Sequence, residues 1–249
     1  MKHIDFYLIT PFKDLVSCYF NESIIQKGVT AEKISVNFIN PRDFTTDKHH
    51  TIDDKPYGGT PGMVYMFEPF YKAVMHAKQL ISKTDVSKTF TVLFKPDAKM
   101  LNDSFVKDFN AQFSDESISF ILILPRYEGI DARILELVDF SVSVGPYVLT
   151  GAELVGAIFV DVFARFVDGV LGNPKSNVDD TSFVINNNEL YVQKEADVYT
   201  RPRVVNVEGK DLEVPEIYLS GHHAQINEFR KSSKKKTKVQ FLSINDITK

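Results

Sequence analysis

Cysteine is almost absent from this 249-residue sequence, with Cys18 as its single representative. One thiol can form neither an intrachain disulfide nor a zinc site built from several thiolates, and we expect Cys18 to lie in the core. No apolar run approaches the roughly 20 residues that a membrane-spanning helix requires. The segment Met1–Phe6 lacks the apolar stretch and cleavage site of a secretory signal. We therefore expect a cytoplasmic protein without membrane association.

Several common catalytic signatures are also missing. The chain has no Gly-x-Ser-x-Gly segment, and its six histidines never take the His-Glu-x-x-His spacing. The glycine-rich stretch Asp53–Met63 does not end in Lys-Ser or Lys-Thr, as a P-loop does. Serine-hydrolase, zinc-protease and P-loop functions are thus disfavoured. Asp53–Met63 is either a loop of defined shape or an ordinary surface turn.

The chain also lacks an overall positive charge, since its formal net charge is −4. This argues against a protein that coats nucleic acid through bulk positive potential. Cations are nevertheless concentrated near the end of the chain, with six of them in residues 230–238. Such a run either contacts phosphates or covers a solvated surface, so RNA contact stays open.

Short apolar segments alternate with helical patterns over the first two thirds of the chain. The β-branched runs of strand length are Ile4–Ile9, Ile34–Phe38, Phe90–Phe94, Ile118–Leu124 and Phe140–Val144. The segments with helical spacing are Leu15–Lys27, Phe67–Ser82, Asp103–Phe113 and Asp131–Val138. This alternation predicts an α/β fold with a mostly parallel sheet. The nearly continuous apolar run Ile118–Leu124 predicts its central strand.

Ligands of open α/β sheets bind beyond the carboxyl ends of the strands. Three loops occupy those positions here, namely Lys95–Pro96, Pro125–Gly129 and Gly145–Tyr147. The third loop leads into an apolar helix, and Thr150 and Glu153 have the spacing of a capping box, so we expect that helix to begin at Thr150. The sequence therefore predicts one crevice formed by three loops.

The apolar helix carries a single arginine, Arg165, four residues after Asp161. A cation on such a helix must either be paired or face a site. The sequence leaves both interpretations of Arg165 open.

Composition changes after residue 172. Residues 173–198 are rich in asparagine and acidic side chains, which predicts a flexible interdomain linker. Residues 199–249 include a helical pattern from about His222 to Lys231 and predict a small helical domain. We therefore expect two domains, 1–172 and 199–249, joined by this linker.

An ordered set of motifs runs nearly from end to end of the chain. The motifs are Asn40–Phe44, Asp53–Met63, Arg126–Asp131, Tyr147–Glu153, Gly169–Gly172, Tyr199–Pro202 and Leu219–Ala224. In this combination the sequence resembles the bacterial tRNA (guanine-N1)-methyltransferase family, TrmD. Any one motif could arise by chance, whereas the ordered set is highly specific.

The resemblance implies a SPOUT fold, with a mostly parallel sheet, a trefoil knot and a small helical C-terminal domain. It implies S-adenosyl-L-methionine as the methyl donor, bound in the knot, and a homodimer whose active site spans both subunits. Magnesium is a further family requirement for which no site is evident in the sequence. The implied cofactor-binding residues are Leu93, Lys95, Pro96, Pro125, Tyr127, Gly129, Val144, Gly145, Pro146, Tyr147, Val148 and Leu149.

The implied substrate is guanosine at tRNA position 37, beside the anticodon. Guanine N1 must lose its proton before it can attack a methyl group, and negative charge then builds on O6. By resemblance Asp180 is the base, Arg165 stabilises that charge and Glu128 helps to orient guanine. Counting back from Phe183 leaves Asp179 as an alternative base. The basic run and the helix after Ser220 would then hold the tRNA backbone.

Two prolines depart from the family pattern. Pro125 replaces a glycine at a cofactor contact and removes a backbone donor, and Pro146 stands where an acidic residue is usual. These departures motivate an alternative, a tRNA-binding homologue with weakened or lost methyl transfer. A SPOUT methyltransferase acting on another RNA is a third possibility.

Overall fold

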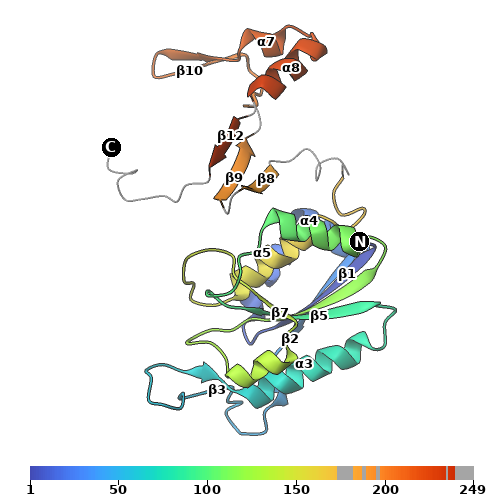
Figure 1. Cartoon of the computed structure of the whole chain (residues 1–249), viewed down its shortest axis with the longest axis vertical. Coiled ribbons are helices and arrows are strands. Elements are labelled where there is room, and N and C mark those ends of the chain that lie inside the picture. The colour runs from blue at the N-terminus through green and yellow to red at the C-terminus, as the bar shows by residue number, and fades with distance from the viewer. Residues whose placement is uncertain (173–181, 187–188, 195–196, 234, 239–249) are drawn as a thin grey trace. The chain divides into compact units, whose positions relative to one another are not determined.

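The computed structural model describes residues 1–172, 182–186, 189–194, 197–233 and 235–238 (Figure 1). The chain divides into two compact units, Met1–Val178 and Asp179–Lys249, and each is described by itself. None of the helices in the described ranges has the length and apolar character needed to cross a membrane.

A five-stranded parallel sheet forms the centre of the first unit. Its strands are β1 (His3–Ile9), β2 (Ile34–Ile39), β5 (Lys88–Phe94), β6 (Ser117–Ile123) and β7 (Phe140–Val142). Their order is β2-β1-β6-β5-β7, and every neighbouring pair is parallel. The predicted α/β fold and the central position of the Ile118–Leu124 run are both confirmed. The trefoil knot stays a prediction.

Helices cover both faces of this sheet (Figure 1). The core on one face includes residues of α1 (Ser17–Phe20), α2 (Ser23–Thr30), α4 (Asp103–Gln112) and α5 (Glu153–Ala164). The core on the other includes residues of α3 (Phe67–Ile81) and the 3-10 helix η3 (Ala132–Leu137). Successive residues of β1 alternate between these cores, with Phe6 in the first and Tyr7 in the second. Burial on both faces explains why β6 reads as a nearly continuous apolar run.

Short elements complete the first unit. They are the 3-10 helices η1 (Lys13–Leu15) and η2 (Pro41–Phe44) and the paired strands β3 (Asp53–Asp54) and β4 (Val64–Tyr65). The glycine-rich stretch Asp53–Met63 begins with β3 and is followed directly by β4. The glycine-rich stretch is therefore closed by a two-stranded ladder at its ends.

Three local expectations were wrong. Leu15–Lys27 is not one helix, because Asn21 and Glu22 lie between α1 and α2, and Ser23 at the start of α2 has a φ of +56°. Asp131–Val138 forms the 3-10 helix η3 rather than an α-helix. Cys18 is exposed rather than in the core.

Helix α5 begins at Glu153 and not at Thr150, so the expected capping box is also wrong. Its N-cap is Ala152, and no side chain caps the helix. Residues just before it pair instead with the loop that follows β6, through an isolated bridge between Arg126 and Gly151. The Glu153 carboxylate is engaged by other partners, described below.

The second unit contains strands as well as helices. Strands β8 (Ser182–Asn186), β9 (Glu189–Lys194) and β12 (Lys235–Lys238) form an antiparallel sheet in the order β12-β9-β8. Strands β10 (Val204–Val207) and β11 (Lys210–Glu213) form a hairpin, followed by α7 (Glu216–Leu219) and α8 (His223–Ser233). The unit thus differs from the helical domain and linker expected from the sequence. The β-branched and aromatic residues of β8 and β9 explain why strands form within 173–198. The domain boundaries themselves stay a prediction.

Candidate active site

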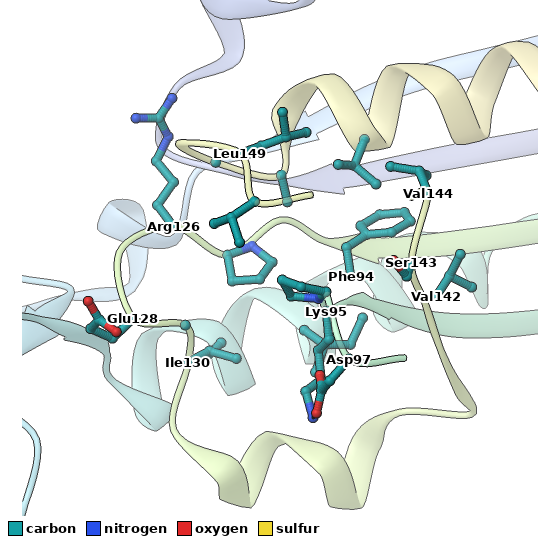
Figure 2. A pocket seen from close by; sticks show the side chains of 18 of the residues that line it. Phe94, Lys95, Asp97, Arg126, Glu128, Ile130, Val142, Ser143, Val144 and Leu149 are labelled. Atoms are coloured by element: carbon teal, nitrogen blue, oxygen red, sulfur yellow. The ribbon is translucent and has the colours of Figure 1, made fainter. Parts of the chain in front are cut away.

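A cavity of about 420 Å³ opens at the carboxyl ends of the parallel strands. Its walls come from the chain that follows β5, β6 and β7, so the three loops expected to converge do so (Figure 2). Cavities of roughly 300–1,000 Å³ are typical of sites for small ligands. The strand-end argument therefore leads to a site of suitable size for a cofactor.

Most of the predicted cofactor residues line this cavity. They are Leu93, Lys95, Pro96, Pro125, Tyr127, Gly129, Val144, Gly145, Tyr147, Val148 and Leu149. Pro146, in contrast, is not among the lining residues. Glu128 lies in the wall as well. Their roles toward a ligand stay predictions.

The cavity combines apolar side chains with a few charged ones. Leu93 and Ile134 are buried apolar residues in its wall, which suits a flat nucleoside base. The same wall also includes a charged pair, in which the Lys95 ammonium lies 3.3 Å from a carboxylate oxygen of Asp97 (Figure 2). A Cβ atom built on Gly129 would meet no atom within 4 Å, so free space adjoins the backbone there. The walls therefore fit a nucleoside with a polar, charged extension.

Backbone contacts fix the loop that carries Glu128. Tyr127 has a φ of +56° and Gly129 a φ of +111°, which turns the chain sharply at this point. The Gly129 N–H donates to the Arg126 carbonyl at 2.9 Å, and the Gly129 carbonyl accepts from Tyr65 N–H at 3.0 Å. The loop is thus attached to β4 and not only to the sheet.

The glycine-rich stretch packs against this same loop. The Glu128 N–H donates to the Met63 carbonyl at 3.1 Å. A Cβ on Gly62 would lie only 2.6 Å from Cγ of Glu128. Asp53–Met63 therefore includes a direct support for Glu128, and the alternative of an ordinary surface turn is not adequate for its last residues.

A buried carboxylate was missed by the sequence argument. Glu153 is 2% exposed, and its Oε1 accepts from the Thr10 hydroxyl at 3.0 Å. The Arg126 Nε–H lies 3.0 Å from both Glu153 carboxylate oxygens. Thr10 follows β1 and Arg126 follows β6, which are neighbouring strands, so the strand-end rule offered a signal for this cluster.

Arg165 is the C-cap residue of α5 and does not line the cavity. One turn earlier, the Asp161 carboxylate accepts a hydrogen bond from the Tyr19 hydroxyl of α1. That bond, together with burial, raises the pKa of Tyr19 to about 12. The candidate bases Asp180 and Asp179 lie outside the described residues. Of the predicted catalytic residues, Glu128 and Arg165 lie within the described residues, and their roles stay predictions.

In the described part of the chain, no three His, Cys, Asp or Glu side chains gather closely enough to hold a metal ion. The magnesium expectation has no support from these residues.

Known proteins share this sequence and fold over most of their length. The profile of the family described as "tRNA (Guanine-1)-methyltransferase TrmD" matches residues 4–244. A tRNA (guanine-N(1)-)-methyltransferase of Fervidobacterium nodosum is 39% identical over 92% of this chain and 85% of its own length. The corresponding protein of Thermosipho africanus is 37% identical over 94% of this chain and 86% of its own length.

A solved structure agrees with these sequence relatives. The crystal structure of the tRNA (m1G37) methyltransferase from Aquifex aeolicus superimposes with a TM-score of 0.69 and 31% identity. The match covers 92% of this chain and 88% of that one. Because the family profile spans nearly the whole sequence and the fold agrees with it, this chain belongs to the TrmD family of tRNA (guanine-1)-methyltransferases.

Proposed function

We propose that this protein transfers a methyl group from S-adenosyl-L-methionine to N1 of guanosine 37 in tRNA. The observation that carries the proposal is the cavity at the ends of β5, β6 and β7, because the three loops that line it are those that the family resemblance implies for the cofactor. The relatives named above act on tRNA guanine, and family membership extends that activity to this chain.

The cofactor would be held by residues of the three loops. The apolar wall that includes Leu93 and Ile134 would receive the adenine base, and the Lys95–Asp97 pair offers both charges to the amino-acid end. When bound, the cofactor supplies an electrophilic methyl group on a sulfonium. The loop from Pro125 to Gly129 would fix its position and exclude water.

The chain's own groups would then prepare guanine for attack. The Asp180 carboxylate, with Asp179 as the alternative, takes the proton from N1. Electron density that builds on O6 is stabilised by the Arg165 guanidinium. The freed N1 electron pair would then form the bond to the methyl group that the cofactor supplies, and the electrons of the broken carbon–sulfur bond would stay on sulfur. Glu128 orients the guanine within reach of both groups.

A homodimer is part of this proposal. Leu154 and Ile158 of α5 are 60% and 41% exposed although both are large and apolar. Their spacing places them on one stripe of the helix with Asp161 and Arg165. A second copy packed on this stripe would cover the apolar side chains and lie beside Arg165. That arrangement would complete the active site across two subunits.

Methyl transfer tests the proposal directly. Purified protein is incubated with unmodified tRNA that carries guanosine at position 37, with labelled cofactor, and with a matched tRNA that carries adenosine there. We expect methylation of the first tRNA alone. Repeating the assay with a chelator tests the magnesium expectation. A protein that binds the cofactor normally and methylates neither tRNA contradicts the proposal.

The choice of base has its own matched pair of variants. Asp180→Asn should abolish turnover while calorimetry still detects cofactor binding, because the amide cannot accept the N1 proton. Asp179→Asn is the control and should retain turnover. The reverse result would assign the proton transfer to Asp179.

A further inference from the structure

We infer that Glu153 is a positioning residue for methyl transfer, acting through Arg126 on the loop that carries Glu128 and one wall of the cofactor cavity. This inference rests on the proposed function. It is independent of the base and of Arg165, since it concerns how the cavity holds its shape.

The Glu153 carboxylate joins three segments that are far apart in the sequence. It receives the Thr10 hydroxyl from the end of β1 and the Arg126 Nε–H from the end of β6, each at 3.0 Å, while Glu153 itself begins α5. Its 2% exposure removes it from water. A buried carboxylate is tolerated only when its charge is paired and its oxygens accept hydrogen bonds, and these contacts provide both.

The surroundings of this ion pair leave little freedom for movement. A Cβ on Gly151 would lie 2.5 Å from Oε2 of Glu153 and 2.6 Å from Nε of Arg126, so the backbone closes over the pair. The neighbouring Ala152 N–H donates to the Pro125 carbonyl at 3.0 Å. Both hydrogen-bonded segments, Pro125–Arg126 and Gly151–Ala152, line the cavity.

Arg126 is also held on its outer side. Its guanidinium carbon lies 4.7 Å from the centre of the Phe12 ring, a cation–π geometry. The Phe12 N–H donates to the Thr10 hydroxyl oxygen at 3.0 Å, so the backbone that carries this ring is held by the same threonine that contacts Glu153. Arg126 is thus held from two sides by residues anchored at the end of β1.

The position of Arg126 is transmitted to the site by the backbone. Glu128 is two residues away, and the Gly129 N–H donates back to the Arg126 carbonyl. Removing the Glu153 charge would leave Arg126 without its partner and release the start of this turn. Displacements of about 1 Å in a catalytic site can cost roughly 100-fold in rate.

The experiment uses Glu153→Gln, Arg126→Gln and the double variant in the full-length protein, with Glu136→Gln as control. Glu136 is exposed on η3 and does not line the cavity. We expect each single variant to bind the cofactor about 10-fold or more weakly in calorimetry, with KM for tRNA changed less than about 2-fold. The double variant should be no weaker than the worse single variant, because both changes break one interaction.

A milder change keeps the test informative if Glu153→Gln fails to fold. Thr10→Val removes the hydroxyl's hydrogen bonds to Glu153 and from Phe12 N–H but keeps the ion pair, so we expect a cofactor affinity reduced by about 3-fold with the control unchanged. Wild-type affinity in all variants, or equal loss of cofactor and tRNA binding, would overturn the positioning role while the wild-type enzyme remains active. A wild-type protein that binds no cofactor would instead contradict the proposed function itself, and this inference with it.

Discussion

Gly62 lies where two requirements for glycine coincide. Its φ is +99°, and a Cβ would lie 2.6 Å from Cγ of Glu128. We expect Gly62→Ala to lower kcat by about 10-fold or more, because the Glu128 side chain must move to make room for the alanine Cβ. Backbone strain should add about 1–2 kcal/mol of destabilisation, measured by urea unfolding.

Gly58 provides the matched control for that substitution. Its φ is +89°, but a Cβ there would meet no atom within 4 Å. Gly58→Ala should therefore show the strain in urea unfolding without the loss of kcat. Equal kcat values for the two variants would contradict a supporting role of Gly62.

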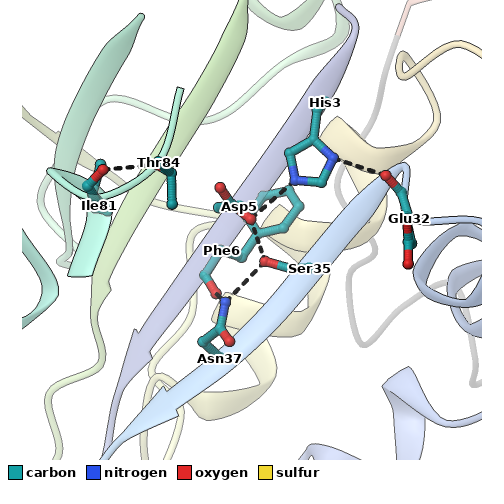
Figure 3. A network of polar contacts seen from close by, with 8 residues as sticks. All are labelled: His3, Asp5, Phe6, Glu32, Ser35, Asn37, Ile81 and Thr84. Carbon is teal, nitrogen blue, oxygen red and sulfur yellow. Dashed lines mark hydrogen bonds and ion pairs between the residues drawn. The ribbon is translucent and has the colours of Figure 1, made fainter. Parts of the chain in front are cut away.

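A polar network joins the first two strands near their beginning (Figure 3). The His3 ring has Nε2 3.0 Å from Oδ1 of Asp5 and Nδ1 3.0 Å from the Glu32 carbonyl oxygen. Both neighbours are acceptors, so the doubly protonated ring suits the site, and the hydrogen bond to Asp5 raises the pKa of His3. Burial opposes ionisation of Asp5, yet hydrogen bonds from His3 and Ser35 outweigh it and lower the pKa of Asp5.

This network predicts a pH-dependent stability. The raised pKa of His3 stabilises the folded state fully below pH 6.5, the ordinary pKa of histidine. This stabilisation is lost as the pH rises through the pKa of His3 in the folded protein. The lowered pKa of Asp5 stabilises the folded state above pH 3.8, the ordinary pKa of aspartate. This stabilisation is lost as the pH falls through the pKa of Asp5 in the folded protein. Wild type should therefore exceed His3→Gln in unfolding free energy most strongly between these limits, by less than about 1 kcal/mol. A difference in unfolding free energy between wild type and His3→Gln that stays constant up to pH 9 would contradict this pH dependence.

At the residue scale, the sequence predicted the position of the cavity but not the residues that hold its loops in place. Parallel strands end at one edge, so the loops after Phe94, Leu124 and Val144 could be brought together without coordinates. Glu153 was missed because its spacing to Thr150 offered a local explanation as a helix cap. Its real partner Thr10 lies 143 positions away, and no local pattern points to such a contact.

At the element scale, an aromatic cluster joins α5 to the central strand. Phe159 is fully buried, with ring centres 5.0 Å from Phe120 and 4.4 Å from Phe163. We expect Phe159→Ala to reduce the unfolding free energy by about 3–5 kcal/mol, because it removes buried apolar area and leaves a cavity. Phe105→Ala is the control, since Phe105 is 38% exposed and should cost clearly less in the same urea titration. Similar losses for both variants would contradict this account.

Strands were easier to predict than helices in this chain. All five predicted strands of the first unit form, and burial on both faces is most complete in β6, whose apolar run marked it as the central strand. The helical pattern Leu15–Lys27 contained no sign of the left-handed conformation at Ser23, which divides it. The strands β8 and β9 were missed because polar residues around them favoured a linker.

At the scale of the whole molecule, the exposed stripe of α5 is the surface that we propose for assembly. Ile158→Asp places a charge in the surface proposed to face a second copy, and we expect sedimentation to show monomers where wild type forms dimers. Methyl transfer should fall at least about 10-fold, since a partner would no longer lie beside Arg165. Met75→Asp is the control, because Met75 is equally apolar and 38% exposed but lies on α3 at the other face of the sheet. A monomeric wild type, or a dimeric and active Ile158→Asp, would contradict the dimer proposal.

The strand order also determines when the central strands can pair during synthesis. Strand β1 leaves the ribosome first, and Ile4 pairs with Ile34 on one side but with Ile118 on the other. Closing so long a loop is entropically costly, and parallel pairing of distant strands is slow. Until Ser117–Ile123 has emerged, one edge of an apolar strand stays without its partner. Nascent chains stalled before that point should therefore depend on chaperones, whereas chains stalled after β7 should not.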